Sequence, residues 1–367
     1  MYYCVMYYGH MADDSDSQTV SRRDVLRTGT IASTAILAGC IGGGGDTLSY
    51  ISRGGITQES EREVMEEWSE ESGVDVTHQE VSDDSEILEL IAASPEEFDF
   101  TNLVPAAFSE HRLEYDGELF ATIDYGEIPN YDNIKDSWQD APFLEGHDLG
   151  TFYYNNSQGI AYSTEHAEPT SWEDIMEPEH EGTVTLHDNA VTRFANTSAL
   201  LDIDPAEAVN DDDLWDEVAS EMEEFHQNTF NYWVAGDEWM RLLREEQAHL
   251  VEGWGGRTEN LVEEGHPVDY VIPEEGCLTY STAFTVVDES EMKEDVYDLL
   301  NFLYERENAV ELTLGHRYPV QLEDPPDEIT ERHDYTDHPD DVLWFDWDEI
   351  VPVQAELESL HAEIKSI

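Results

Sequence analysis

Basic side chains are scarce in this sequence. The 367 residues include 16 lysines and arginines against 86 aspartates and glutamates, which gives a formal net charge of −70. Such a polyanion repels the phosphates of nucleic acid and the anionic surface of a membrane, so nucleic acid is excluded as a partner. Because 40% of the residues are hydrophobic and 11% aromatic, the chain can still form a core, and its length suits two domains or one two-lobed domain.

The shortage of positive charge also indicates the salt concentration in which the protein works. In ordinary salt this many like charges would destabilise the compact state by self-repulsion. At molar ionic strength the Debye length falls to about 3 Å, and most of the repulsion is screened. We therefore expect a halophilic protein that works in concentrated salt.

Cysteine is nearly absent, with only Cys4, Cys40 and Cys277 in the chain. Cys4 precedes Met11, which opens a polar stretch and is a more natural start than Met1. Cys40 belongs to the leader described next, which leaves Cys277 alone. No intramolecular disulfide is therefore expected in the mature chain, and its stability must come from core packing.

The N-terminal residues have the features of an export leader. Residues 21–27 read Ser-Arg-Arg-Asp-Val-Leu-Arg, as in a twin-arginine signal, and an uncharged stretch of signal-peptide length follows. It ends in Leu37-Ala38-Gly39-Cys40, which resembles a lipobox, where the cysteine is lipidated. We predict a twin-arginine signal with lipobox over residues 1–40 and a glycine-rich tether over 41–47. The mature protein would then be extracytoplasmic and held by Cys40 on the outer face of the cytoplasmic membrane.

Catalytic motifs are also missing. The sequence has no nucleophile elbow, P-loop, dinucleotide fingerprint after a strand or zinc-protease motif. It has no Cys-x-x-Cys pair, and among its 14 histidines His180, His187 and His226 are not spaced to bind one metal without long-range help. Carboxylates are so common that acidic pairs are uninformative. We expect no catalysis, no cofactor and no metal site, and the exported body looks like a binding protein.

Hydrophobic patterning after residue 47 predicts an α/β fold. Strand-like runs at 48–51, 74–77 and 98–104 alternate with acidic helical runs at 60–72 and 86–93. Such alternation is typical of a mostly parallel sheet with helices on both faces. In open sheets of this kind the ligand lies beyond the carboxyl ends of the strands.

Three segments resemble, in order, the spermidine/putrescine-binding proteins, the receptors of polyamine ABC importers. The segments run from Pro169 to Phe194, with Ser171-Trp172 and Asp188-Asn189-Ala190, from Gly253 to Gly276, and from Leu299 to Pro319. The resemblance implies a two-lobed, periplasmic-binding-protein-like fold of type II, with lobes joined by crossing strands near Asn156, Ser281 and Pro326. It also implies a monomer that closes on a small-molecule solute and presents it to the permease and ATPase subunits of the importer. The expected lobes are 48–156 plus 281–326 for lobe 1 and 157–280 plus 327–367 for lobe 2.

The same resemblance implies where the ligand would bind. A polyamine receptor uses carboxylates for the ammonium groups and aromatic rings for the chain between them. Carried over residue by residue, the aromatic positions are Phe108, Trp254, Tyr280 and Tyr318, and Asp188 is the anchoring acid. The chain departs from the family pattern where Asn189, Thr192 and Thr282 replace acids and where Arg53 replaces a tryptophan. Arg53, Arg193 and Arg257 all fall in segments that would form the cleft.

Two main ligand classes therefore stay open. A polyamine would be held by the aromatic rings and Asp188, whereas an anionic solute, such as an amino acid derivative or organophosphonate, would be gripped by Arg53 or Arg257 through their forked guanidinium groups. Fe(III), suggested by the pair Tyr153-Tyr154, and thiamine are further alternatives in the same role. The predicted ligand-binding residues are Arg53, Phe108, Asp188, Thr192, Trp254, Arg257, Tyr280, Thr282 and Tyr318.

Overall fold

The computed structural model describes residues 46–339 and 342–367. The predicted export signal, the lipobox with Cys40 and nearly all of the tether lie outside the described residues. The described residues form one compact unit. None of the helices within the described ranges is both long and apolar enough to cross a membrane.

The first of two five-stranded sheets has the order β2-β1-β3-β10-β4. Strands β1 (Thr47–Arg53), β2 (Asp75–Val81) and β3 (Phe100–Leu103) run parallel to one another. Strand β10 (Thr282–Val286) lies antiparallel between β3 and β4 (Thr151–Tyr154). Because β10 follows all the strands of the second sheet, the chain leaves the first sheet after β4 and returns to it at β10.

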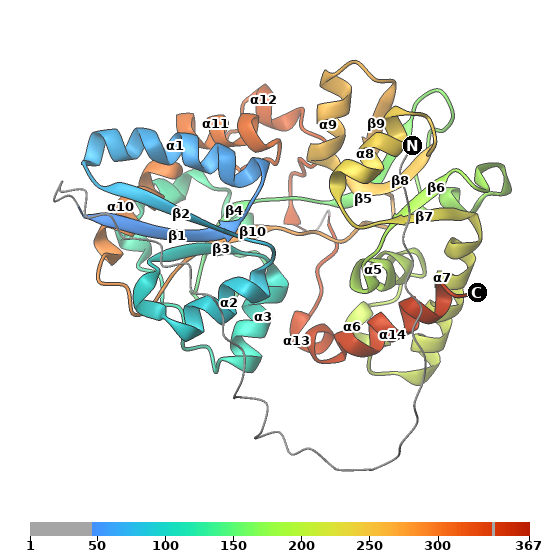
Figure 1. Ribbon diagram of the computed structural model, residues 1–367, viewed down its shortest axis with the longest axis horizontal. Helices are drawn as coiled ribbons and strands as arrows, with labels where there is room; N and C mark the ends of the chain where they lie inside the picture. Colours follow the sequence, from blue (N-terminus) through green and yellow to red (C-terminus); the bar gives the residue numbers. More distant parts are fainter. Residues whose placement is uncertain (1–45, 340–341) are drawn as a thin grey trace, which may run out of the picture. The chain divides into compact units, whose positions relative to one another are not determined.

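Helices cover both faces of the first sheet. Figure 1 shows α1 (Ile56–Ser72) and α11 (Arg306–His316) on one face and α2 (Asp84–Ala93) and α3 (Pro105–Glu114) on the other. Helix α1 begins directly after Gly54-Gly55 and buries Val64, Met65 and Trp68 on one side. Shorter elements in this part of the chain are η1 (Pro95–Glu97), η2 (Tyr125–Glu127), η3 (Pro129–Asn133) and α4 (Asp136–Gln139).

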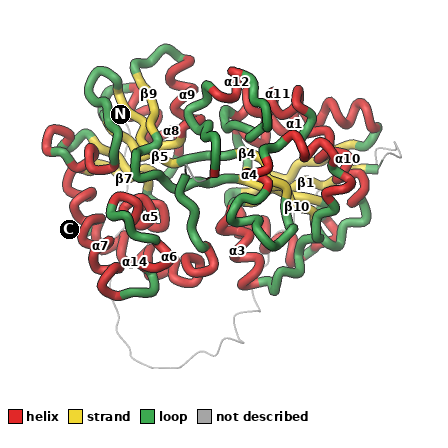
Figure 2. Tube along the Cα trace, turned by 180° about the vertical axis from the view of Figure 1, so that it is seen from behind, coloured by secondary structure: helices red, strands yellow, loops and turns green. Residues whose placement is uncertain are grey.

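The second sheet has the order β7-β6-β8-β5-β9. Strand β6 (Val184–His187) runs parallel to β7 (Thr229–Trp233) and β8 (Leu250–Trp254), whereas β5 (Gln158–Ser163) is antiparallel to β8 and β9 (Val268–Val271). Figure 2 shows α5, α7 and α14 on one side of this sheet and α8 and α9 on the other. The remaining elements are η4 (Trp172–Met176), η5 (Pro178–His180), α5 (Ala190–Leu200), α6 (Pro205–Ala208), α7 (Asp212–Asn228), α8 (Gly236–Arg244), α9 (Gly255–Glu263), α10 (Lys293–Leu303), α12 (Asp327–Thr330), α13 (Trp347–Ile350), η7 (Val351–Val353) and α14 (Gln354–Ile364).

The two-lobed α/β fold predicted from the sequence is therefore confirmed, and the expected mostly parallel sheet is mixed. The parallel strands are those that helices connect, such as β1 to β2 and β2 to β3. Strands β5 and β10 are antiparallel to their neighbours because each enters its sheet directly from the other one. No helix intervenes to turn the chain back into the parallel direction.

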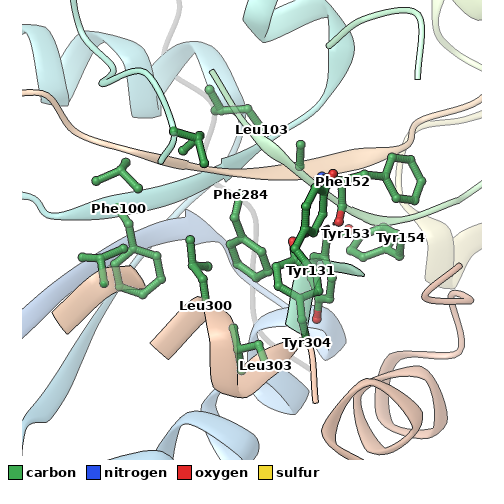
Figure 3. Packing of buried hydrophobic residues seen from close by; sticks show 14 of the residues in the cluster. Phe100, Leu103, Tyr131, Phe152, Tyr153, Tyr154, Phe284, Leu300, Leu303 and Tyr304 are labelled. Atoms are coloured by element: carbon green, nitrogen blue, oxygen red, sulfur yellow. Dashed lines mark hydrogen bonds between the residues drawn. The ribbon is translucent and has the colours of Figure 1, made fainter. Parts of the chain in front are cut away.

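The core of the first lobe is rich in aromatic rings (Figure 3). Phe284 of β10 lies 4.4 Å from the ring of Tyr153, measured between centroids, and β3 contributes Phe100 and Leu103. The hydroxyl of Tyr304 is fully enclosed and donates to Thr151 Oγ1 at 2.8 Å. Burying each such large apolar side chain stabilises the fold by about 1.5–3 kcal/mol.

The interior of the second lobe contains an ion pair. Arg193 Nη1 lies 3.0 Å from Glu252 Oε1, and these side chains are 1% and 0% exposed. The guanidinium also lies 4.3 Å from the ring centre of Phe225, and Asn196 donates to Glu252 at 2.7 Å. Arg193 therefore belongs to the interior of this lobe, and its suggested place beside a cleft is wrong. Its side chain points inward to a buried carboxylate.

The C-terminal segment contributes to both lobes. Ile329 packs in the first core, whereas Trp347 and Leu357 pack in the second. Between them Leu343 pairs with Leu278 as an isolated bridge. The third crossing between the lobes, expected near Pro326, therefore lies further along the chain. The division predicted from the sequence placed all of residues 327–367 in lobe 2, whereas in the structure both lobes share them.

Candidate functional site

Two segments carry the chain between the sheets, residues 155–157 after β4 and residues 278–281 before β10. They run side by side, because Gln158 N–H donates to the Leu278 carbonyl at 2.9 Å and Tyr280 N–H donates to the Asn156 carbonyl at 2.7 Å. The side chain of Asn155 adds bonds from the hydroxyls of Thr279 and Ser281 at 2.6 and 2.9 Å. These paired segments, the crossing, are the place where a small backbone rotation would change the angle between lobes.

Asp334 ties a third segment to the crossing. Its Oδ1 accepts from the backbone N–H of Ser157 at 3.0 Å and from the Ser157 hydroxyl, and its Oδ2 accepts from the N–H of Gly256 at 2.7 Å. A Cβ atom on Gly255 would lie 2.6 Å from Asp334 Oδ1, so glycine is needed for this approach. Burial raises the pKa of Asp334 to about 7. Sequence reasoning missed this residue, since nothing in the local pattern marks one acid among 86.

Three of the predicted ligand-binding residues come together at the start of α9. Trp254 ends β8, Arg257 lies in the first turn of α9, and Tyr318 follows α11 in the core of the first lobe. A Cβ atom on Gly256 would lie 2.6 Å from the Tyr318 ring, so the two lobes touch here at a glycine. Burial raises the pKa of Tyr318 above its usual range, and the adjacent Arg257 guanidinium opposes that rise.

Aromatic rings continue from this point toward both sheets. Tyr318 stacks on Tyr154 with centroids 5.3 Å apart and planes 19° apart. Trp254 is half-buried and meets the ring of Trp233 edge-on at 4.9 Å. The indole N–H of Trp254 is buried and has no hydrogen-bond acceptor among the described residues. Trp138 and Trp239 in the cores share this feature, but Trp254 is only half-buried, so a ligand beside its ring can supply the acceptor.

Arg257 is also without an acidic partner. It forms no ion pair with any carboxylate in the described ranges, whereas Arg317 nearby pairs with Glu263 at 2.8 Å. In a chain with 86 acids, a partly exposed guanidinium beside a tyrosine and a tryptophan stands out. Such a group can bind a carboxylate or phosphate in two parallel hydrogen bonds.

Arg53 lies at the carboxyl end of β1, as predicted, but its charge is already used. Its Nη1 lies 2.6 Å from Asp84 Oδ2, and its Nη2 donates to Asn102 at 3.3 Å. Behind it Glu61 accepts from the hydroxyl of Tyr50 at 2.7 Å and from Asn102 at 2.9 Å. Burial raises the pKa of Glu61 to about 8. Arg53 is therefore less available to an anion than Arg257.

Thr192, Tyr280 and Thr282 form a second group. The hydroxyls of Thr192 and Tyr280 lie 2.6 Å apart, so helix α5 is joined to the crossing. Asn189 caps α5 by accepting from the N–H of Thr192 at 2.9 Å. Thr282 is fully buried and lies opposite Tyr154 in the β10–β4 register. These hydroxyls provide hydrogen-bonding capacity without charge.

Asp188 and Phe108 are engaged elsewhere. Asp188 accepts from the ammonium of Lys365 and from His361 Nε2, which lies 3.1 Å away on α14. Although burial opposes it, the Lys365 ammonium holds the pKa of Asp188 below its usual range. Phe108 is 1% exposed and packs on Phe143 in the first core, with centroids 5.7 Å apart. Lys365 is thus bonded to Asp188, the carboxylate that was expected to bind an amine of the ligand. Phe108 is part of the core of the first lobe.

The tyrosine pair considered for Fe(III) meets edge-on, with ring centroids 4.7 Å apart. The two rings come together because β4 ends at Tyr154, where the strict alternation of strand side chains no longer holds. The hydroxyl of Tyr153, however, lies 3.1 Å from His316 Nε2 inside the core. Only Tyr154 is placed toward Tyr318.

Known proteins resemble this chain over most of its length. The chain is 21% identical over 275 residues to spermidine/putrescine-binding periplasmic protein 1 of Haemophilus influenzae, covering 73% of this chain and 75% of that protein. It is 23% identical over 262 residues to the spermidine/putrescine-binding periplasmic protein of Escherichia coli, covering 70% and 73%. The solved spermidine/putrescine substrate-binding protein PotD of Streptococcus pneumoniae superimposes with a TM-score of 0.75 at 16% identity, covering 87% of this chain and 99% of that one. The model of the bacterial extracellular solute-binding protein family matches residues 111–352, and the chain belongs to that family.

Proposed function

We propose that this protein is the receptor of an ABC importer, capturing a small organic solute where the lobes meet and presenting it to the permease and ATPase subunits. The observation that carries the proposal is the gathering of Trp254, Arg257 and Tyr318 from two lobes beside the crossing. Binding there would favour the closed arrangement of the lobes, and the permease would recognise that arrangement. The role is capture and presentation, without catalysis.

A polyamine is the first candidate ligand, because the relatives named above are spermidine/putrescine-binding proteins. The rings of Tyr154, Tyr318 and Trp254 suit a chain of methylenes and cationic nitrogens. An acid for the terminal ammonium is the missing part, since Asp188 is bonded to Lys365.

An anionic solute is the second candidate, and specific contacts favour it. Arg257 forms no ion pair in the described part of the chain, and the buried N–H of Trp254 has no acceptor there. Both groups would be satisfied by a carboxylate or phosphonate. Fe(III) gains less support, because His316 already bonds Tyr153, and nothing in these contacts favours thiamine.

Isothermal titration in about 3 M salt, where self-repulsion is screened, would separate the two ligand classes. Spermidine and putrescine form one arm; glutamate and a small phosphonate form the other. Saturable binding in either arm that Trp254→Ala removes and Trp215→Ala leaves intact would support the site. Binding of neither class, or binding that both variants leave unchanged, would contradict it.

We further propose that a twin-arginine leader exports the protein and that a lipid on Cys40 holds the monomer at the membrane. The lipobox-like sequence before Cys40 and the short apolar stretch support this reading. Cells that produce Cys40→Ser should release the protein into the medium, whereas Cys277→Ser, which changes the buried cysteine, should leave it attached. Continued attachment of the Cys40 variant would contradict the anchor.

A further inference from the structure

A cavity of about 400 Å³ opens on the second lobe, between the loop at residues 164–169 and the short helix η5. Its walls are acidic, with Glu177 and Glu179 among them, and they include His166 and His180. Carboxylates alone carry little information in this chain. Two histidines in one cavity carry more, because the sequence has only 14.

Glu177, Glu179 and His180 are positioned to act together. Each offers one ligand atom, and these three atoms lie within 4.8 Å of one another. The proximity follows from the backbone, because Pro178 starts a 3-10 turn that brings residues three apart to the same side. The two glutamates are exposed, whereas the histidine is buried.

His180 supplies the independent sign of a ligand. It is 7% exposed, lines the cavity, and has no hydrogen bond to its ring from any residue the structure describes. The nearest carboxylate oxygen, on Glu179, lies 4.0 Å from Nε2, beyond hydrogen-bonding distance. The ring nitrogens are not fully enclosed, so they are open to the cavity, where a metal ion can take an imidazole nitrogen as a ligand.

One of the two cavity histidines packs against a third histidine. His166 stacks on His249 with centroids 3.9 Å apart and planes 10° apart. His166 lines the same cavity as His180.

We propose that Glu177, Glu179 and His180 form a binding site for a divalent transition-metal cation such as Zn²⁺, open on its remaining side to the cavity. The imidazole selects for this class, since Ca²⁺ and Mg²⁺ prefer all-oxygen ligands. Bound metal would hold Glu177, Glu179 and His180 together and stabilise the short helix η5 in the second lobe. The site is separate from the crossing, so it does not depend on the identity of the solute.

The test uses the full chain, freed of metal, in molar NaCl. Titration with Co²⁺ should saturate at one equivalent and give the visible absorption of a low-symmetry nitrogen–oxygen site, and Zn²⁺ should displace it. The double variant Glu177→Gln/Glu179→Gln changes two exposed side chains and should weaken binding by about 10- to 100-fold. The double variant Glu66→Gln/Glu67→Gln removes the same charge from exposed positions on α1 and should bind as the parent does.

Three results would overturn the proposal. They are no saturable Co²⁺ binding by the parent, unchanged binding by the Glu177/Glu179 variant, and equal loss in both double variants, which would mean that Co²⁺ merely associates with the acidic surface. His180→Gln gives a second readout through the Co²⁺ spectrum. The loss of its nitrogen ligand should shift the visible band, whereas His147→Gln, at an exposed histidine of the first lobe, should leave the band in place.

Discussion

Two regions of the molecule use arginine in opposite ways. In the interior of the second lobe, Arg193 is enclosed and paired with Glu252 at 3.0 Å. At the start of α9, Arg257 is partly exposed beside Tyr318 and pairs with no carboxylate of the described ranges. The first arginine balances a charge inside the protein, and the second is available to one from outside. In so acidic a chain, an arginine therefore reports on function only when its acidic partner is missing.

Removing Arg193 should have the largest effect. Arg193→Ala leaves Glu252 buried and unpaired, which should lower the free energy of unfolding by about 3–5 kcal/mol. The double variant Arg193→Met/Glu252→Leu removes both charges and should recover much of this loss. Urea unfolding in concentrated salt measures the three proteins. If Arg193→Ala lowers the free energy of unfolding by no more than the double variant does, the ion pair between Arg193 and Glu252 is not the important contact.

Glu61 is a second buried carboxyl that can be compared with Glu252. Neutral groups donate hydrogen bonds to Glu61, whereas Arg193 forms an ion pair with Glu252. Burial raises the pKa of Glu61 to about 8 in the folded state, whereas an unfolded glutamate titrates near its ordinary value of about 4.3. Between these values the folded state holds a proton that the unfolded state has lost. Stability should therefore fall as the pH rises from about 5 to 8, by up to about 1.4 kcal/mol per pH unit from this group.

Glu61→Gln should flatten this part of the stability curve, measured by urea unfolding at several pH values. Glu63→Gln, at an exposed position two residues away on α1, is the control and should keep the slope of the parent. Equal slopes in all three proteins would remove Glu61 as the cause.

Arg257→Ala tests the arginine that has no acidic partner in the described ranges. If the solute is anionic, its affinity should fall by about tenfold or more, equivalent to about 1.4 kcal/mol, because a forked charge-assisted contact is lost. The free energy of unfolding should change by less than about 0.5 kcal/mol, since no internal ion pair is broken. Arg241→Ala, which breaks an exposed pair with Glu245, is the matched control. A polyamine ligand would instead bind Arg257→Ala at least as tightly as the parent.

Surface charges and interior charges should respond differently to the salt concentration. The smallest change in stability is expected for the interior charges. Lowering the salt from about 3 M to 0.1 M lengthens the Debye length from about 2 Å to about 10 Å and should lower the melting temperature of the parent through surface repulsion. The cost of Arg193→Ala should stay within about 0.5 kcal/mol between the two conditions, because a buried pair is little screened. A melting temperature as high in dilute salt as in concentrated salt would contradict the expected halophilic character.

Much of the fold could be predicted from the sequence, because alternating strand and helix patterns depend on local hydrophobic spacing. Part of the site could be predicted as well. Trp254 and Arg257 share a stretch of four residues, so their proximity follows from the local sequence. Tyr318 reaches these two residues through a contact between the lobes. The local sequence pattern could not predict that contact, and Tyr318 was included in the site because of the family resemblance.

Other residues could not be placed from the sequence, for physical reasons. Asp188 has the right chemistry for an amine, but the last helix of the chain brings Lys365 onto it. Asp334 and the cavity histidines depend on contacts between segments far apart in the sequence, as between Ser157 and Asp334 or His166 and His249. Spacing along the chain carries no trace of such contacts.

The paired segments of the crossing restrict the motions open to the lobes. Two chains joined by hydrogen bonds form a ribbon, which flexes out of its plane more easily than its strands slide past each other, because sliding would break the bonds at Leu278 and Asn156. With Asp334 bonded to both Ser157 and Gly256, twisting about the ribbon would also break contacts. Bending of the ribbon is therefore the motion between the lobes that breaks the fewest of these hydrogen bonds.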